Sequence, residues 1–555
     1  MLSYRKLAMR VLGRPLHTGR IDSPRPASQR AAAFVLTAAM LITLTAPAFA
    51  ETWYIENGDI TVKASGTEGK NTVSQGDKKD VEDTNTIITN QNKDKASSHT
   101  VTIEAEDHKV EVTLDNVNIE TGSGSALTSK GDVTLTLKGD NHLTGGISDN
   151  GSYGLSGISS SGSLTISGGE TDSLTAQGGS GTDGSGGRGI FSKDLTISGG
   201  TVNANGGDGK NGSGGSGITS LGSLTISGGT VNAAGGDGTN SSDGGDGITN
   251  NRGVTISSGG TVTAKGGSGE DGSGGRGISS FGGVTISSGG TVTATGGNST
   301  GSDGSGGDGI SSTSTTISGG TVTADGGSGN FSGGNGIRSF DVAISGGTVN
   351  VAGGNGGNGS GSDVGNGIIS SDIDLSGSLE LTAKAGSPNG KALSRAGREL
   401  ELDTIKDKLD PGAKVTTTDA NGKVNQVSIP RPVEPEEPVI PGDSSSSSGG
   451  GSAGASVQES VFPGLVVTDK DGQRISYTST QSGNTLTVCV GRLTASFRIS
   501  LAALRQLRAE GIETIAFQTV LCSTTLSVDE LLAMGGEDAE AVLTHRFTDS
   551  SLTVG

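Results

Sequence analysis

Residues 189–216 read GIFSKDLTISGGTVNANGGDGKNGSGGS, one unit of a repeat that fills the middle of the chain. Its Gly-Ile dipeptide recurs at intervals of 27–32 residues, with the isoleucine at Ile158, Ile190, Ile218, Ile248, Ile278, Ile310, Ile337 and Ile368. A fixed period in this range is typical of stacked repeat folds, in which each unit buries its apolar face only against its neighbours. The repeat therefore decides the fold before any single residue is considered.

Each unit contains three short stretches with the pattern of β-strands. Leu195 and Ile197 alternate with polar residues, as do Val202 and Ala204, which predicts strands with one buried face. The Gly199-Gly200 pair between them supplies the positive φ angles of a sharp corner. All 12 prolines lie outside residues 48–387, as expected if the strands there are paired on both sides. We therefore predict an all-β fold, a parallel β-helix of about 10–12 coils with a period of about 30 residues, over residues 52–387.

The segments after the repeat differ in composition. Residues 388–429 carry mixed charges, and we expect them to cap the open end of the β-helix, where an uncovered edge would invite aggregation. Residues 430–456 are rich in proline, serine and glycine, which predicts a linker.

Residues 457–555 are predicted to form a small α+β domain of unknown role. Strand patterns at 473–477, 485–490, 495–499 and 514–518 accompany two short helices, at 501–510 and 528–534. Ser500 is expected to cap the first of these helices. Cys489 and Cys522 are the only cysteines, and they form either a disulfide or two buried thiols.

The N-terminal 50 residues have the pattern of an export signal. A basic stretch up to Arg30 precedes an apolar run from Ala31 to Leu44, and Ala48-Phe49-Ala50 fits a cleavage site. The alternative is an uncleaved anchor. Cleavage would leave a protein that is secreted or held at the cell surface, with no membrane segment after the signal is removed.

Charge and chemistry narrow the functional classes. A net charge of −19 argues against nucleic acid as a partner. The five histidines lie outside the clear repeats, and the acidic residues are spread through similar coils. An enzyme of the glycosidase type needs one distinct carboxylate pair, whereas repetition of a surface suits the binding of an extended polymer. We therefore expect a binding protein rather than an enzyme.

Acidic residues gather near the glycine-rich connection of each coil and are expected to stack in columns. Calcium takes six to eight oxygen ligands with tolerant geometry, which such columns could offer. A solvated acidic rim is the alternative. In the column just before Gly-Ile, Arg276 has Asp246 and Asp308 one coil away on either side, an alternation of charge that favours a structural role. The candidate calcium ligands are Asp208, Asp237, Asp243, Asp246, Asp271, Asp303, Asp308 and Asp363.

The unit G-I-x-S-x-x-[LV]-T-I-S-G-G-T-V-[NT]-A-x-G-G resembles the repeat of secreted bacterial carbohydrate-binding β-helix proteins. That family is similar to pectate lyases in fold but lacks their catalytic residues. The resemblance covers residues 52–387 and implies a right-handed parallel β-helix, bound calcium and binding of an acidic plant polysaccharide such as polygalacturonate.

The sequence thus favours an exported, non-catalytic, calcium-dependent protein that binds an extended polysaccharide, with no carbohydrate-binding residue assigned. One alternative is a surface rod or adhesin that presents the C-terminal domain and contacts cell-wall components. A second is a lyase of uronate polymers, which would use Arg276 as the base beside a bound calcium.

Overall fold

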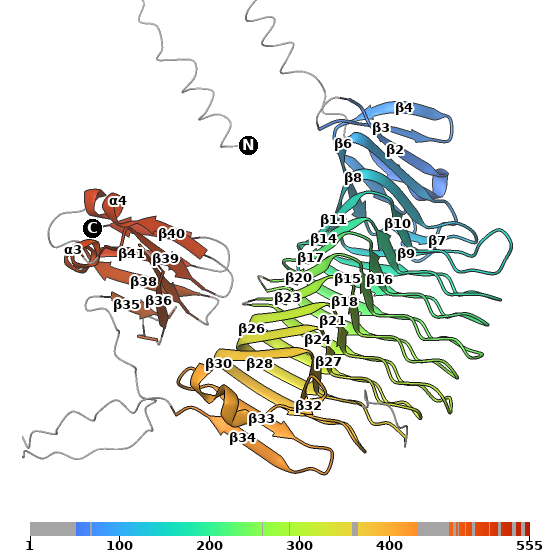
Figure 1. Ribbon diagram of the computed structural model, residues 1–555. Coiled ribbons are helices and arrows are strands. Elements are labelled where there is room, and N and C mark those ends of the chain that lie inside the picture. Colours follow the sequence, from blue (N-terminus) through green and yellow to red (C-terminus); the bar gives the residue numbers. More distant parts are fainter. Residues whose placement is uncertain are drawn as a thin grey trace, which may run out of the picture. The chain divides into compact units, whose positions relative to one another are not determined.

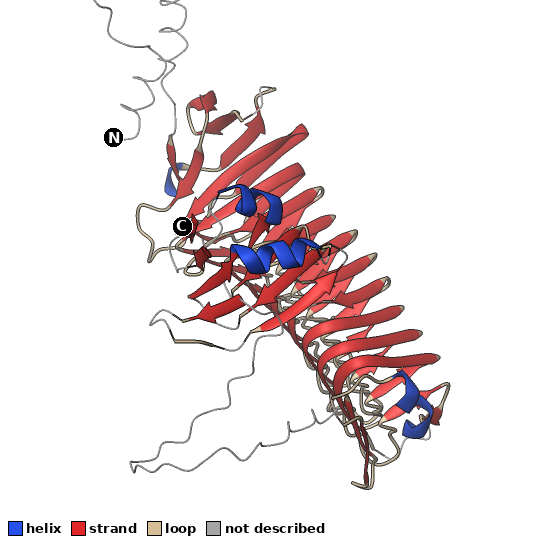
Figure 2. Ribbon diagram, turned by 90° about the vertical axis from the view of Figure 1, so that its left-hand side faces the viewer, coloured by secondary structure: helices blue, strands red, loops and turns tan. Residues whose placement is uncertain are grey.

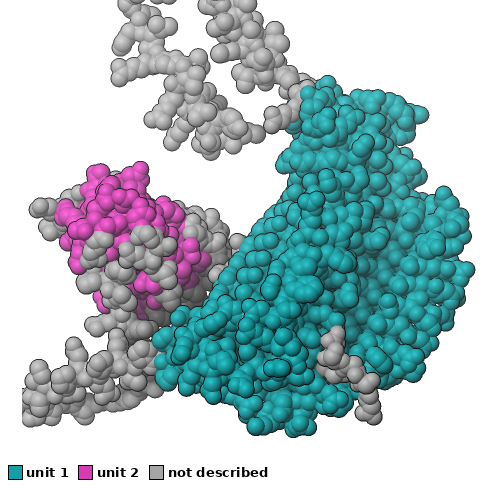
Figure 3. Space-filling view, viewed as in Figure 1, with its two compact units in different colours: residues 1–435 teal, residues 436–555 magenta. Residues whose placement is uncertain are grey.

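The computed structural model describes residues 51–430, except 67–68, 258, 288 and 358–364, and residues 465–554 apart from short gaps at 470–472, 476, 483, 491–493, 510, 520–522, 535–539 and 546–549. The predicted signal peptide and all of the predicted linker beyond Pro430 lie outside these residues. The chain divides into two compact units, residues 1–435 and 436–555 (Figure 3). No helix in the described segments is long and apolar enough to cross a membrane.

The first unit is a parallel β-solenoid of about 13 coils with a period of about 30 residues, which confirms the predicted fold with slightly more coils than expected (Figure 1). Its strands stack as successive parallel rungs (Figure 2). Each repeat contributes one strand to each of three parallel sheets, here numbered 1 to 3 in the order in which the chain visits them.

The three sheets contain the three predicted strands of the repeat. Sheet 1 includes β10 (Ile158–Ser160), β13 (Ile190–Ser192), β16 (Ile218–Ser220), β19 (Ile248–Asn250), β22 (Ile278–Ser280), β25 (Ile310–Ser311), β27 (Ile337–Arg338), β29 (Ile368–Ser370) and β31 (Leu393–Arg395). Sheet 2 includes β11 (Ser163–Ser167), β14 (Asp194–Ile197), β17 (Ser223–Ile226), β20 (Gly253–Ile256) and β23 (Gly283–Ile286). Sheet 3 includes β7 (Asn118–Glu120), β9 (Asp140–Thr144), β12 (Ser173–Gln177), β15 (Thr201–Asn205), β18 (Thr230–Ala234), β21 (Thr261–Lys265), β24 (Thr291–Thr295) and β33 (Lys414–Thr418).

Several longer strands run through a corner and serve two sheets. In the first coils these are β6 (Val101–Asp115) and β8 (Leu127–Lys138), which pair in sheets 1 and 2. In the last coils β26 (Ser314–Asp325), β28 (Asp341–Ala352) and β30 (Asp372–Lys384) pair in sheets 2 and 3.

The core consists of columns of identical or similar residues. Ile190 lies beside Ile158 and Ile218, and Val202 lies beside Val231, each pair in parallel register one coil apart. The predicted inward residues Leu195, Ile197, Val202 and Ala204 are all buried. Burial of one such aliphatic side chain contributes roughly 1.5–3 kcal/mol, so each coil depends on contact with the next.

Both ends of the solenoid are covered. At the start, β1 (Thr52–Tyr54), η1 (Ile55–Asn57), β2 (Ile60–Ala64), β3 (Asn71–Gln75), β4 (Lys78–Asp83) and β5 (Thr86–Thr89) include an antiparallel β2–β3–β4 ribbon, and buried Trp53 donates Nε1–H to Asp83 Oδ2 over 2.8 Å. At the end, β31 and β33 of the predicted cap still add parallel strands to sheets 1 and 3, and β32 (Arg398–Glu399) and η2 (Leu402–Lys408) lie between them in the chain. β34 (Val424–Ser428) then pairs antiparallel with β33.

The glycine-rich connections between sheets 3 and 1 form a second stack beside the strands, where backbone packs directly on backbone (Figure 1). Gly215 N–H donates to Gly207 O within one coil over 2.8 Å, and Gly236 N–H of the next coil donates to Gly215 O over 2.9 Å. A Cβ atom at Gly207, Gly215 or Gly245 would overlap a backbone carbonyl oxygen of the preceding coil. The glycines thus permit close packing, and the hydrogen bonds offset the entropy lost in ordering these loops.

The second unit contains two four-stranded sheets among its described residues. One consists of β35 (Leu465–Thr468), β38 (Ala495–Ser500), β41 (Glu540–His545) and β42 (Ser550–Val554), and the other of β36 (Thr478–Ser482), β37 (Thr485–Cys489), β39 (Thr514–Gln518) and β40 (Ser523–Ser527). The helices are α3 (Leu501–Ala509) and α4 (Val528–Met534). Ser500 Oγ accepts the Ala503 N–H at 3.2 Å, so it caps α3 as predicted.

Substitution of Gly245 by alanine should destabilise the solenoid strongly. The new methyl group would meet the Gly215 backbone, which cannot move without displacing the coils stacked on it. Overpacking of this kind costs about 1–3 kcal/mol, and we expect the upper end of that range. The midpoint of urea unfolding, followed by circular dichroism, measures the loss. Gly253→Ala is the control, because serine already occupies its equivalents Ser223 and Ser314. Equal midpoints for the two variants would contradict the packing argument.

Candidate ligand-binding face

Two of the predicted calcium ligands form part of a hydrogen-bonded column. Asp208 Oδ1 accepts the Asp237 N–H over 2.9 Å, and Asp237 Oδ1 accepts the Ser268 N–H over 2.7 Å. Farther along, Asn298 and Asn355 accept backbone amides in the same way. One oxygen of each side chain therefore ties its coil to the next.

The other predicted ligands do not converge. Asp243, Asp271 and Asp303 are exposed on the glycine-rich loops of three different coils, and Asp363 lies outside the described residues. Within the segments that the structure describes, no three His, Cys, Asp or Glu side chains are grouped closely enough to hold a metal ion. The described residues thus provide no assembled calcium site, and calcium dependence stays a prediction.

Asp308 begins a buried ladder in the column before Gly-Ile. Its Oδ1 accepts both the backbone N–H and the Nδ2–H of Asn335 over 2.8 Å. Asn335 Oδ1 accepts the same two groups of Asn366 over 3.0 and 2.9 Å. All three side chains are buried, so the ladder satisfies polar groups that would otherwise be unpaired.

The free oxygen of Asp308 holds two arginines. Its Oδ2 lies 3.0 Å from Arg338 Nε and 3.9 Å from Arg276 Nε. Arg276 comes from the coil before Asp308 and Arg338 from the coil after it, and their side chains are 47% and 43% exposed. Asp308 is only 4% exposed, so it is a fixed anchor that holds Arg338 closely and Arg276 more loosely.

Asp246 lies on the other side of Arg276, as the sequence predicted. Its Oδ1 accepts the Arg276 backbone N–H over 2.8 Å, and its Oδ2 accepts the Thr249 hydroxyl over 3.0 Å. Burial raises the pKa of Asp246, and the Arg276 amide and charge only partly offset that rise. The arrangement gives Asp246 a structural role in the column.

Arginine and phenylalanine concentrate around sheet 1. Every arginine and phenylalanine between residues 158 and 395 lies on a sheet 1 strand, in the turn that follows it, or in the loop that leads into it. These residues are Arg188, Arg252, Arg276, Arg338, Arg395, Phe191, Phe281, Phe331 and Phe340. Phe281 and Phe340 are 71% and 69% exposed, although phenylalanine is usually buried.

Depressions follow this face along several coils. A groove of about 700 Å³ contains Arg276, Asp308, Phe331 and Arg338 in its lining. An adjoining pocket of about 330 Å³ shares the two arginines and adds Phe281 and Phe340. Nearer the N-terminus a third depression, of about 580 Å³, is lined by Phe191, Lys193, Leu221 and Arg252, among others. We call the surface formed by these three depressions the Arg/Phe face.

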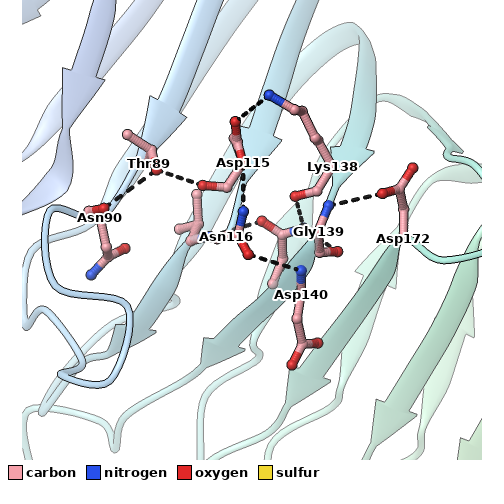
Figure 4. A network of polar contacts seen from close by, with 10 residues as sticks. Thr89, Asn90, Asp115, Asn116, Lys138, Gly139, Asp140 and Asp172 are labelled. Atoms are coloured by element: carbon pink, nitrogen blue, oxygen red, sulfur yellow. Dashed lines mark hydrogen bonds and ion pairs between the residues drawn. The ribbon is translucent and has the colours of Figure 1, made fainter.

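The first coils show what a purely structural polar cluster looks like (Figure 4). Asp115 receives hydrogen bonds from Lys138 Nζ over 2.7 Å and from Asn116 Nδ2 over 2.5 Å. Partial burial raises the pKa of Asp115, but these two hydrogen bonds outweigh it and leave the pKa below its usual value. Gly139 N–H is held by Asp172 Oδ1 over 2.8 Å. Here Lys138 pairs with Asp115, and Asp172 holds a backbone amide, so these charged groups serve contacts between coils.

Sequence reasoning found the Arg276 column but missed the exposed rings. Phe281 and Phe340 both stand three residues after the isoleucine of Gly-Ile. The neighbouring coils have Asn251, Thr313 and Ser371 there. Large apolar residues at a position that is polar in the neighbouring coils were the available signal, and Leu221 shows it again two coils before Phe281.

The disulfide prediction falls partly outside the described residues, which omit Cys522. Cys489 ends β37, and its Sγ–H donates to Gln518 Oε1 over 3.3 Å. Burial raises the pKa of the Cys489 thiol, which favours its protonated form at neutral pH.

Comparison of the chain with family models, with curated proteins and with solved structures finds no match. The solenoid fold agrees with the resemblance drawn from the repeat, but no family is shown. Function therefore has to be argued from the surface itself.

Replacement of Asp308 by alanine should destabilise the solenoid by about 1–3 kcal/mol, because two buried donors of Asn335 lose their acceptor. Asp308→Asn should retain most of the stability, since Asn335 shows that an amide oxygen serves in this column. The part that is lost comes from the other side-chain atom, since the Nδ2 of the variant would face Arg276 and Arg338 where the buried Oδ2 now accepts their charge. Urea unfolding midpoints measure both variants. An asparagine variant as unstable as the alanine variant would show that the charge, rather than the ladder, matters here.

Proposed function

We propose that the solenoid is a non-catalytic module that binds an extended acidic polysaccharide along the Arg/Phe face. The observation that carries this proposal is the collection of all arginines and phenylalanines of residues 158–395 around one sheet of an acidic rod. Structural needs do not explain it, because Phe281 and Phe340 are mostly exposed and contribute little to the core.

The chemistry of the face suits sugar acids. Arginine forms paired hydrogen bonds with carboxylates, and its planar group is less strongly hydrated than the lysine ammonium. Aromatic rings offer flat apolar surfaces on which the C–H faces of pyranose rings can lie. Asp308 orients Arg276 and Arg338 beforehand, which reduces the entropy lost on binding.

An acidic protein and an acidic polymer repel each other, and the local charge of the Arg/Phe face reduces this repulsion. The chain carries a net charge of −19, but charges beyond about 8–10 Å are largely screened at physiological salt. The three depressions are lined by equal numbers of basic and acidic side chains, so the Arg/Phe face is locally neutral although the chain as a whole is acidic. The basic residues are Lys193, Arg252, Arg276 and Arg338, and the acidic ones are Asp194, Asp243, Asp246 and Asp308. The export signal expected from residues 1–50 agrees with a ligand outside the cell.

Alanine substitution of Phe281 or Phe340 should weaken binding to polygalacturonate about tenfold, the change expected for loss of about 1.4 kcal/mol. Affinity electrophoresis and calorimetry with the full-length mature chain measure this effect. Tyr153→Ala is the matched control, because Tyr153 is 52% exposed but lies outside the Arg/Phe face. If the wild-type chain binds neither acidic glycans nor xylan or cellulose, the proposal is wrong and the surface-rod alternative gains support.

Two further readouts from the same samples test the remaining sequence predictions. Loss of binding in EDTA would confirm calcium dependence, whereas retained binding would show that the protein groups suffice. Unsaturated or reducing products from polygalacturonate would support the lyase alternative, and Arg276→Ala should then abolish them.

A further inference from the structure

The exposed apolar residues of the Arg/Phe face recur on every second coil. Leu221, Phe281 and Phe340 each stand three residues after their Gly-Ile isoleucine, and they are 44%, 71% and 69% exposed. The coils between them place Asn251 and Thr313 at the same corner. Backbone hydrogen bonds fix this alignment: Asn251 N–H donates to Ser220 O over 3.1 Å, and Phe281 N–H donates to Asn250 O over 2.9 Å.

Two of these coils carry an arginine as well as the phenylalanine, although not at equivalent positions of the repeat. Arg276 stands two residues before Ile278 in the coil of Phe281, and Arg338 stands one residue after Ile337 in the coil of Phe340. Ser311, Ser312 and Thr313 of the intervening coil line the pocket between the pairs with small polar side chains. Strands in neighbouring coils lie about 4.8 Å apart, so Phe281 and Phe340 are spaced by about 10 Å along the stack. Arg276 and Arg338 reach toward Asp308 of the intervening coil from either side. We call each phenylalanine with the arginine of its coil a station.

We infer that the ligand is an acidic polysaccharide whose structure repeats every two sugars. This inference rests on the proposed function and specifies its ligand. A 1→4-linked pyranose unit in an extended chain is about as long as one coil is high. In a flat chain with two-fold screw symmetry, every second ring presents the same face, and every second carboxylate points to the same side.

Such a chain would match the stations without distortion. One ring would lie on Phe281 with its carboxylate at Arg276, and the second ring along the chain would lie on Phe340 with its carboxylate at Arg338. The ring between them would lie over the small side chains of the intervening coil. A helical polymer would turn its acidic groups away from this straight line and meet only one station at a time.

The site can be extended or disturbed by single substitutions at equivalent positions. Leu221→Phe adds an aromatic ring in phase with Phe281 and Phe340, beside Arg252 in the third depression. Asn251→Phe and Thr313→Phe add the same ring on the coils that are out of phase. Asn251 and Thr313 are exposed. The three variants therefore differ chiefly in whether the new ring lies on a coil that continues the every-second-coil spacing of Phe281 and Phe340.

Calorimetry on the full-length mature chain with polymannuronate, an extended two-fold chain with an acid on every sugar, tests the inference. We expect Leu221→Phe to raise the affinity about three- to tenfold, and Asn251→Phe and Thr313→Phe to leave it unchanged or lower it. Equal gains for all three variants would overturn the two-sugar repeat and would indicate a generally adhesive face. Tight binding by wild type with no response to any variant would also overturn it, while leaving the proposed function intact.

Two other polymers test which feature of the ligand matters, the spacing of its acidic groups or the extended shape of its chain. Hyaluronate carries a uronic acid on every second sugar, whereas carboxymethyl amylose is acidic but helical. Binding of hyaluronate as tight as that of polymannuronate would show that one acid per two sugars suffices, and weaker binding would assign the site to a homopolymer of uronic acid. Carboxymethyl amylose should bind at least tenfold more weakly than the better of the two, and equal binding would contradict the inference. Failure of the wild-type chain to bind any acidic polymer would instead refute the proposed function itself.

Discussion

The structure depends on parallel backbone pairing between equivalent residues of successive coils. Ile190 pairs with Ile158 before it and Ile218 after it, and the same relation holds along all three sheets. Because side chains in register point in the same direction, each position of the repeat becomes a column. Apolar columns build the core, asparagine and aspartate columns satisfy one another's polar groups, and the surface columns offer repeated chemistry to a ligand.

The same constraint explains the glycine content. With 101 glycines in 555 residues, the chain has a composition that suggests flexible linkers. In the solenoid, however, Gly207, Gly215 and Gly245 lie where a Cβ would overlap the neighbouring coil. The loops are therefore narrow stacks held by backbone hydrogen bonds, and each stack supports the edge of sheet 1 on which the Arg/Phe face is built.

The proposed function rests on residues that differ from their equivalents in the neighbouring coils. Perfect repetition would place the same side chain on every coil, and most columns come close to this. Phe281, Phe340 and Leu221 break the pattern at one corner, Arg338 breaks it on sheet 1, and Arg276 stands in the loop that leads into that sheet. Asp308 contacts both arginines through a buried carboxylate that also belongs to the ladder beneath them. A few substitutions on a uniform scaffold thus create the surface to which we assign ligand binding.

The sequence by itself determined the strands and corners of each coil. The period, the strand alternation and the position of each Gly-Gly corner are local properties of the chain. It predicted that Leu195, Ile197, Val202 and Ala204 point inward, and it placed Arg276 between Asp246 and Asp308. Only the tertiary structure decided what the columns do. Asp208 and Asp237 on the glycine-rich loops each accept a backbone hydrogen bond from the next coil, since stacking places their side chains in line. Likewise, Arg338 and Phe340 lie about sixty residues from Arg276 and Phe281 in the chain, and only stacking brings them into one surface, because spatial neighbours in a solenoid are separated by a whole coil of sequence.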